Sequence, residues 1–372
     1  MRALFKSSLA AVCVCLVLQT AARAETPAEF AAHDPGQFLK VAVVGDTGIG
    51  KRAFAPGFRA VRQAMARQGA DVLLHLGDFA YQSKLFPATC DPEHIRKIRR
   101  TLVEPYRFRL FVPGDNDLPP TPWKPKASGC WKFIDPLDTP FDLPAQPGPG
   151  SFEGTKVIGN VLFAILNTFP WRDPAAWLGP RIERARRDGL WVVLALHEPP
   201  VTTAWFKDKR GTALKQINAL KPDLVFAGHQ HSYERFKPMG VPRGNGELPV
   251  LQPGAAKYVR GRGVIHIVSG GGGATFKPFA DWQGIDKRTA PQEVFAALAV
   301  RALVNHFIIL EFTPQRMRAR TYRVCPAKKT PGENPRWKPE KPFWKTISLP
   351  CDTLPEGTAL FDEFEISRHR ED

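Results

Sequence analysis

The sequence predicts an α/β fold, and two patterns support this class. Five apolar runs of strand length each end in an Asp or His residue, at 39–46, 72–78, 108–115, 191–197 and 224–231. Stretches of helical character separate them, at 56–68, 92–103, 180–187 and 211–220. Short unbroken apolar runs are typical of buried parallel strands, and their alternation with helices is typical of layered sheets covered by helices.

The residues at these five strand ends are all potential metal ligands. Open α/β sheets place their sites at the carboxyl ends of strands, so these side chains are expected to meet. Two metal ions about 3.5–4 Å apart can clamp the attacking and leaving oxygens of a phosphoryl displacement. The side chains available for such a pair are Asp46, Asp78, Tyr81, Asp115 or Asn116, His197, His229 and His231.

The N-terminus has the features of a secretory signal peptide. Two basic residues precede an apolar stretch at 9–18, and Ala22-Arg23-Ala24 forms a cleavage site of the A-x-A type. Cleavage after Ala24 predicts an exported protein, periplasmic or secreted. No later segment reaches the ~20 apolar residues that a membrane-spanning helix needs, so membrane insertion is not expected.

Removal of residues 1–24 lowers the formal net charge from +16 to +13. A basic surface can raise the local concentration of anions, or it can serve only solubility and adhesion to anionic surfaces. The basic residues are scattered, with no basic helix or aromatic platform, so specific nucleic-acid binding is not expected.

We expect one catalytic domain over residues 25–372. It carries a proline-rich insertion at 113–150, expected to act as a lid or substrate wall beside the site. Residues 305–311 and 317–324 are predicted to form a hairpin, and a tail rich in Lys and Pro at 326–372 is expected to lie along the surface. The sequence does not indicate an oligomeric state.

Four cysteines remain after processing, and none forms a C-x-x-C pair. Four cysteines allow three disulfide pairings in an oxidising compartment. We favour the local pairs Cys90–Cys130 and Cys325–Cys351, because each would fix a proline-rich loop.

The ordered motifs resemble those of the calcineurin-like metallophosphoesterases, and in particular the purple acid phosphatase branch. They are Gly45-Asp46-Thr47-Gly48, Gly77-Asp78-Phe79-Ala80-Tyr81, Gly114-Asp115-Asn116-Asp117, Leu196-His197 and Gly228-His229-Gln230-His231. The resemblance covers about residues 39–325. It implies a layered fold with central mixed β-sheets flanked by helices.

The resemblance also implies the ligand set and the chemistry. Asp46, Tyr81 and His231 would bind the first metal, Asp78 would bridge both metals, and the second would be bound by His197, His229 and one residue of the 114–117 segment. In this family a phenolate ligand marks an Fe(III) site, with Fe, Zn or Mn as its partner. The implied activity is hydrolysis of phosphate monoesters, small anionic substrates, by a metal-activated hydroxide.

The third motif departs from the family pattern, which usually has Gly-Asn-His followed by an acidic residue. Matching the glycine makes Asp115 the ligand, and a shift by one residue would make it Asn116. We prefer the first register, which leaves Asn116 and Asp117 as the predicted catalytic residues. Asn116 cannot act as a general acid, and general-acid help is worth about 10²–10⁴-fold in rate.

Alternative readings of the sequence are weaker. Residues 45–51 fit the G-x-x-x-x-G-K pattern of a nucleotide-binding P-loop, but Arg52 stands where Ser or Thr would hold Mg²⁺. A phosphodiesterase or nucleotide hydrolase, or a non-catalytic metal-stabilised binding protein, would retain the same ligands. Gly270–Gly273 could present backbone N–H groups to an anion or form a flexible turn, whereas His75, His266 and His306 are expected in the core or beside the ligands.

Overall fold

The computed structural model describes most of the chain between residues 38 and 368. The described residues are 38–47, 56–79, 81, 93, 96, 98–118, 130, 139–145, 152–207, 210–244, 246–254, 256–274, 276–326, 351 and 354–368. The predicted signal peptide, residues 1–24, and residues 48–51 of the P-loop pattern lie outside this part.

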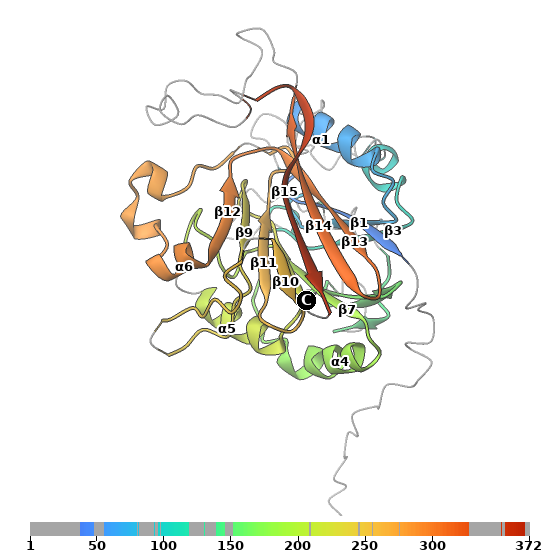
Figure 1. Cartoon of the computed structure of the whole chain (residues 1–372). Helices are drawn as coiled ribbons and strands as arrows, with labels where there is room; N and C mark the ends of the chain where they lie inside the picture. Colours follow the sequence, from blue (N-terminus) through green and yellow to red (C-terminus); the bar gives the residue numbers. More distant parts are fainter. Residues whose placement is uncertain are drawn as a thin grey trace, which may run out of the picture. The chain divides into compact units, whose positions relative to one another are not determined.

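The first sheet has seven strands and mixed direction. Its order is β10 (Lys257–Val259), β15 (Gly357–Ser367), β14 (Arg316–Cys325), β13 (His306–Phe312), β1 (Leu39–Val44), β2 (Val72–His75) and β3 (Phe108–Phe111). The strands β1, β2 and β3 run parallel, whereas β13 pairs with β1 in the antiparallel direction. Figure 1 shows β13, β14 and β15 side by side.

The second sheet has eight strands, again of mixed direction. Its order is β12 (Leu298–Ala302), β9 (Tyr233–Phe236), β11 (Ile265–Ser269), β8 (Leu224–Ala227), β7 (Trp191–Leu196), β6 (Val161–Ile165), β5 (Gly154–Ile158) and β4 (Leu143–Pro144). The four central strands β6, β7, β8 and β11 are parallel. All six residues of β7 are buried, which explains its unbroken apolar sequence.

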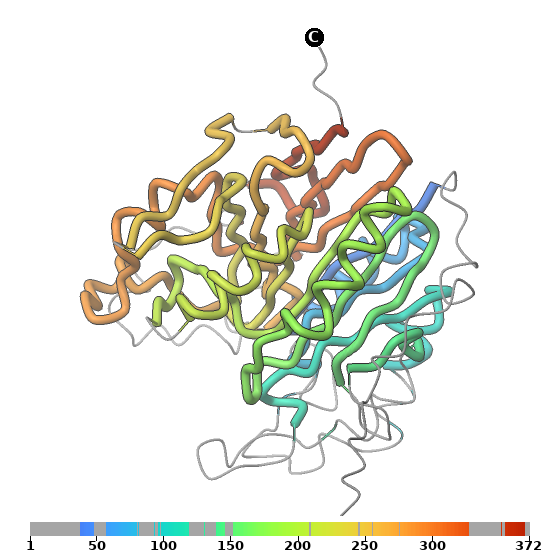
Figure 2. The backbone as a smooth tube through the Cα atoms, turned by 90° about the horizontal axis from the view of Figure 1, so that it is seen from below, coloured from blue at the N-terminus to red at the C-terminus, as the bar shows by residue number. Residues whose placement is uncertain are grey.

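The two sheets share one hydrophobic core, and helices cover their outer faces. Val41 and Val43 of β1 belong to the same core cluster as Phe163 of β6 and Val193 of β7. The helices are α1 (Pro56–Ala66), α4 (Ala175–Arg187), α5 (Gly211–Leu220) and α6 (Gln292–Ala297). Figure 2 shows the green segment containing α4 next to the green strands β6 and β7. The predicted layered α/β class with mixed sheets and flanking helices is therefore confirmed.

The helix α1 illustrates how the sequence positions an element. Phe58, Val61 and Met65 are spaced by three and four residues and are all buried. They pack in one cluster with Ala42 and Val44, whose side chains leave β1 on the face away from the second sheet. The loop between β1 and α1, which carries Asp46, is therefore fixed at both ends.

The other helix predictions hold in part. Residues 211–220 form α5 as expected. The helix α4 begins at Ala175, five residues before the predicted start, and contains Pro180. In the region 92–103, the structure describes a short π-helix, η2, over Arg99–Val103.

The end of the C-terminal tail forms a strand, which the sequence did not predict. Residues 357–367 form β15, which pairs with β14 and β10 inside the first sheet. Asp362 on this strand accepts bonds from Arg235 Nε and Nη2 at 2.6 and 2.9 Å and from the Tyr233 hydroxyl at 2.6 Å. Arg235 is buried on β9 of the second sheet, so this charged contact ties the tail to both sheets.

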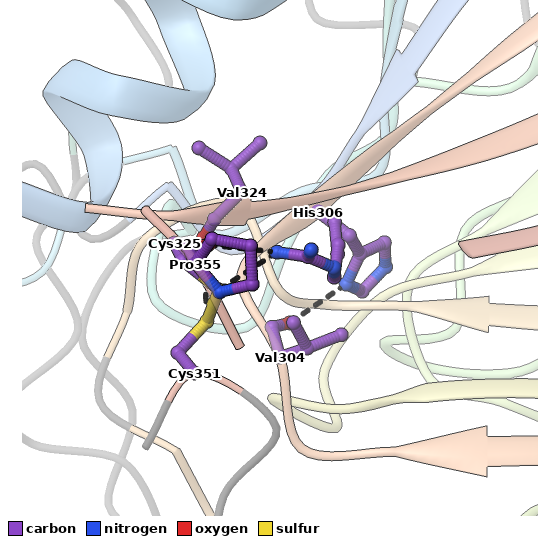
Figure 3. The surroundings of a disulfide bond; sticks show 7 residues. Val304, His306, Val324, Cys325, Cys351 and Pro355 are labelled. Atoms are coloured by element: carbon purple, nitrogen blue, oxygen red, sulfur yellow. Dashed lines mark hydrogen bonds between the residues drawn. A yellow bond between two sulfur atoms is a disulfide. The ribbon is translucent and has the colours of Figure 1, made fainter. Parts of the chain in front are cut away.

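One predicted disulfide is confirmed. Cys325 at the end of β14 is bonded to Cys351, which returns the chain towards β15, and Figure 3 shows this bond beside Pro355. Cys130 is also disulfide-bonded. Its predicted partner Cys90 lies outside the described residues, so that pairing stays a prediction.

The remaining domain predictions are not tested by the fold. Most of the insertion at 113–150 lies outside the described residues, and its role as a lid or wall stays a prediction. The residues described there include β4, which pairs with β5. Among the described residues, no helix has both the length and the apolar composition to cross a membrane.

Candidate metal centre

The five predicted strand ends meet where the two sheets lie next to each other. Three of the loops follow the parallel strands β1, β2 and β3 of the first sheet, and two follow β7 and β8 of the second. All seven predicted ligands lie in these loops or, for Tyr81, three residues beyond Asp78. They form two contiguous groups of side chains.

The first group contains Asp46, Tyr81 and His231. The Tyr81 hydroxyl donates to Asp46 Oδ1 at 2.9 Å and lies 3.0 Å from His231 Nε2. His231 Nε2 is 3.3 Å from Asp46 Oδ1. An oxygen from each of the first two residues and a nitrogen from the third therefore face one small volume, as predicted.

The second group contains Asp78, Asp115, His197 and His229. One ligand atom from each of these residues lies within 4.8 Å of all the others. His197 Nε2 is 3.4 Å from Asp78 Oδ1 and 3.3 Å from Asp115 Oδ1, and His229 Nδ1 is 3.4 Å from the same Asp115 oxygen. Two carboxylates and two imidazoles are a donor set that suits Fe, Zn or Mn.

The nitrogen atoms that face this second group lack hydrogen-bond partners. Neither His197 Nε2 nor His229 Nδ1 makes a hydrogen bond within the described part of the chain, although both are buried. The other ring nitrogen of His197, Nδ1, lies 2.7 Å from the Leu76 carbonyl oxygen. This contact fixes the orientation of the ring and leaves the lone pair of Nε2 free. Buried polar atoms are rarely left unsatisfied, so these two nitrogens fit metal ligands.

Asp78 connects the two groups. Its carboxylate faces His197 of the second group and interacts with the Tyr81 hydroxyl of the first. Burial and the charges of Asp46 and Asp78 raise the pKa of Tyr81 well above its ordinary value. A phenolate at this position therefore needs a cation beside it, which a metal ion would provide.

The electrostatic character of the site also favours cations. Burial disfavours a charged imidazole, but the carboxylates of Asp78 and Asp46 outweigh it and raise the pKa of His197 to about 9. Three carboxylates, those of Asp46, Asp78 and Asp115, thus lie close together in the site. Such a concentration of negative charge is costly unless positive charge compensates it.

The backbone is strained at three of the predicted ligands. Asp46, Asp78 and His229 have positive φ angles of 55°, 53° and 67°. Lys221 is the one other non-glycine residue with positive φ among the described residues. Such conformations cluster at functional sites, where the surrounding structure holds them. Here they turn each side chain into the centre directly after its strand.

Asp115 and Asn116, the two candidate ligands of the third motif, differ in their contacts. Asp115 lies in the second ligand group, whereas Asn116 contacts the carboxylate of Asp78. The Asn116 backbone N–H donates to Asp78 Oδ1 at 2.8 Å and its side-chain amide donates to Asp78 Oδ2 at 2.6 Å. This placement supports the preferred register, with Asp115 in the position of a ligand.

Asp117 differs from its predicted catalytic role. It is buried, with Oδ1 accepting from the Phe79 N–H at 2.9 Å and Oδ2 from the Gly114 N–H at 3.2 Å. The carboxylate therefore joins the loop after β2 to the loop after β3. This geometry fits a positioning residue for Asp78 and Asp115 better than a group that contacts substrate.

The segment Gly270–Gly273 packs against the loop that carries Asp46. The Gly272 N–H donates to the Gly45 carbonyl at 2.9 Å, and the Ala274 N–H donates to the Asp46 carbonyl at 3.0 Å. A Cβ atom on Gly272 would lie 2.3 Å from the Gly45 oxygen. The glycines therefore allow this segment to pack directly against the loop that carries Asp46.

Three further histidines occupy the core, as expected. His75, His266 and His306 are all buried. His75 Nε2 lies 3.2 Å from the Thr47 hydroxyl, next to Asp46, and His306 Nε2 lies 2.9 Å from the Ser269 hydroxyl, next to the glycine segment. Burial lowers the pKa of His75 to about 3, so its ring is neutral.

The fold and these strand-end ligands define a family of phosphoesterases. The family model for calcineurin-like phosphoesterase matches residues 39–233, just over half of the chain, and the chain belongs to this family. This membership excludes the P-loop alternative, since the Gly45-Asp46 motif is part of the matched region. Family and donor set together support a metal-dependent hydrolase.

Two kinds of curated relatives are similar to parts of the chain. An uncharacterized protein of Mycobacterium tuberculosis is 32% identical over 111 residues, which are 27% of this chain and 21% of that protein. The probable inactive purple acid phosphatase 27 of Arabidopsis thaliana is 25% identical over 277 residues, 66% of this chain and 43% of the relative. The chain thus spans less than half the length of these relatives.

Solved structures share the fold at low sequence identity. A purple acid phosphatase from yellow lupin seeds superposes with a TM-score of 0.62 at 16% identity, covering 90% of this chain and 55% of the other. PhoD superposes with a TM-score of 0.53 at 11% identity, covering 90% and 71%. These neighbours show that the chain shares their fold.

Proposed function

We propose that the protein is a binuclear metal-dependent phosphohydrolase that cleaves phosphate monoesters after export from the cytoplasm. The observation that carries this proposal is the pair of ligand groups joined by Asp78. One group offers Asp46, Tyr81 and His231, and the other offers Asp115 with two imidazole nitrogens that have no hydrogen-bond partner in the described part of the chain. This is the arrangement that two neighbouring ions require.

The side chains divide between the two ions according to their chemistry. Tyr81 is a hard oxygen donor, and a phenolate beside Asp46 suits Fe(III). Asp115, His197 and His229 suit Fe, Zn or Mn. When bound, the ions supply Lewis-acid polarisation of the phosphoester and lower the pKa of a water molecule to a value near neutrality.

The protein's own residues set the limits of the reaction. Asn116 occupies the position beside the bridging carboxylate, with its amide donating to Asp78 Oδ2 at 2.6 Å. An amide has no proton that it can give to a leaving alkoxide. The preferred substrates are therefore monoesters with acidic leaving groups, which depart without protonation.

A panel of substrates on stripped and reloaded protein tests this proposal. Chelation is expected to abolish hydrolysis, and reloading with Fe, Zn or Mn to restore it. An aryl phosphate monoester should be cleaved faster than an alkyl monoester and faster than an aryl phosphodiester. A violet absorption band in the iron-loaded protein would support Tyr81 as a phenolate ligand.

Two outcomes would favour the alternatives. Faster cleavage of the diester than of the monoester would indicate a phosphodiesterase or a nucleotide hydrolase. Protein that binds two ions but hydrolyses no ester would be a metal-stabilised binding protein. The lack of a proton-donating acid at Asn116 is consistent with this alternative.

A further inference from the structure

We propose that Lys277 binds the substrate phosphate at the open side of the metal centre and selects dianionic esters. This inference rests on the function proposed above and concerns the same site. It comes from the exposure of the ligands, the position of the lysine ammonium group and the balance of charge around it.

Three of the predicted ligands are partly exposed, namely Tyr81, Asp115 and His229, and the other four are buried. The side chains of Asp46, Asp78 and His197 are at most 1% exposed. By contrast, the side chain of His229 is 17% exposed and that of Asp115 is 14% exposed. The side formed by His229 and Asp115 is therefore open to an approaching substrate.

Lys277 lies on this open side. It follows the glycine segment after β11, and its side chain is exposed. Its ammonium nitrogen donates to the backbone carbonyl of His229 at 3.0 Å. An ammonium group has three donors, and no carboxylate within the described part of the chain lies at ion-pair distance from this one, so two donors remain for a ligand.

Two further cations, Lys207 and Arg210, interact electrostatically with this lysine. Lys207 Nζ and Arg210 Nη2 lie 3.2 and 2.6 Å from the same carboxylate oxygen of Glu198, and the charge of Glu234 also acts on Arg210. The charge of Lys277 interacts with both of them, and also with Asp46 and Asp78 across the centre. The charge of Arg210 also interacts electrostatically with His229.

These cations have a specific use in this chain. Asp115 adds a carboxylate on the side where the substrate enters, and it repels an anion. Lys277, with Lys207 and Arg210 behind it, offsets that repulsion and favours ligands with more negative charge. A phosphate monoester carries two negative charges at neutral pH and a diester carries one, so the lysine contributes to the preference for monoesters.

The test compares three variants in metal-loaded protein. Lys277→Gln removes the charge, Lys277→Arg keeps it, and Lys221→Gln makes the same charge change at the end of α5, before β8 begins. Calorimetry with inorganic phosphate measures binding without turnover, and steady-state assays with an aryl monoester separate KM from kcat. Metal content and thermal unfolding are measured for each variant.

Lys277→Gln is expected to raise the phosphate Kd and the KM by about 10-fold or more while kcat changes by less than about threefold. Lys277→Arg and Lys221→Gln should stay close to the wild type. Equal phosphate Kd values for Lys277→Gln and Lys221→Gln would overturn the inference. If the wild type binds phosphate without cleaving any ester, the proposed function fails, but the Kd comparison still decides the role of Lys277.

Discussion

Replacing Asp78 by Asn is expected to lower turnover by about 10³-fold or more and to reduce bound metal to fewer than two ions per chain. Changes to residues that only support ligands typically cost 10–100-fold, and Asp78 contacts both ligand groups directly. Its Oδ1 faces His197 at 3.4 Å, and its carboxylate also interacts with Tyr81. An amide in its place has one oxygen and no charge, so it cannot bridge two cations.

The matched control is Asp71→Asn. Asp71 is exposed and directly precedes β2, at the end of the strand opposite to Asp78, and its Oδ2 accepts from the Lys40 N–H at 3.1 Å. An asparagine oxygen can accept that bond, so turnover and metal content should remain unchanged. Metal content and turnover are measured for both variants. An Asp78→Asn protein with two ions and normal turnover would show that Asp78 is not the bridge.

Replacing Asn116 by His is expected to raise turnover of an alkyl phosphate monoester by about 10–100-fold. An imidazolium at this position could donate a proton to the leaving oxygen, a contribution worth about 10²–10⁴-fold in favourable cases. The gain should fall below that range because the variant loses the hydrogen bond from the Asn116 side-chain amide to Asp78. An aryl ester with an acidic leaving group should gain little, since it departs without a proton.

The control for this variant is Asn116→Ala, which also loses the hydrogen bond to Asp78 but has no side-chain proton donor. It should show no gain with either substrate. Rates for the two esters are measured for both variants across pH. An equal gain for alkyl and aryl esters, or a gain in Asn116→Ala, would contradict the claim that this chain lacks a general acid at position 116.

Most of the fold was predictable because its signals are local. The strands β7 and β8 are fully buried and read as unbroken apolar runs, and the helix α1 has a regular apolar face in Phe58, Val61 and Met65. The strand β15 was missed because its sequence follows a stretch rich in Lys and Pro. Its place in the sheet depends on distant contacts, such as Asp362 with Arg235, that no local pattern reveals.

The site was predictable to the extent that ligands follow strands. The seven predicted ligands do lie together, because parallel strands place their carboxyl ends at one edge. The structural roles of Asp117 and Gly272 were not predictable, since they depend on which backbone groups the folded loops bring close. Lys277 carried no signal either, because its distance from His229 is set by the packing of the glycine segment.

The most direct test of the central claim is the metal content of the purified protein. Elemental analysis of aerobically purified protein, with Asp78→Asn measured in parallel, counts the ions bound per chain. The two ligand groups joined by Asp78 predict about two ions in the wild type and fewer in the variant. Wild-type protein that contains no metal and takes up none on addition of Fe, Zn or Mn would contradict the binuclear centre.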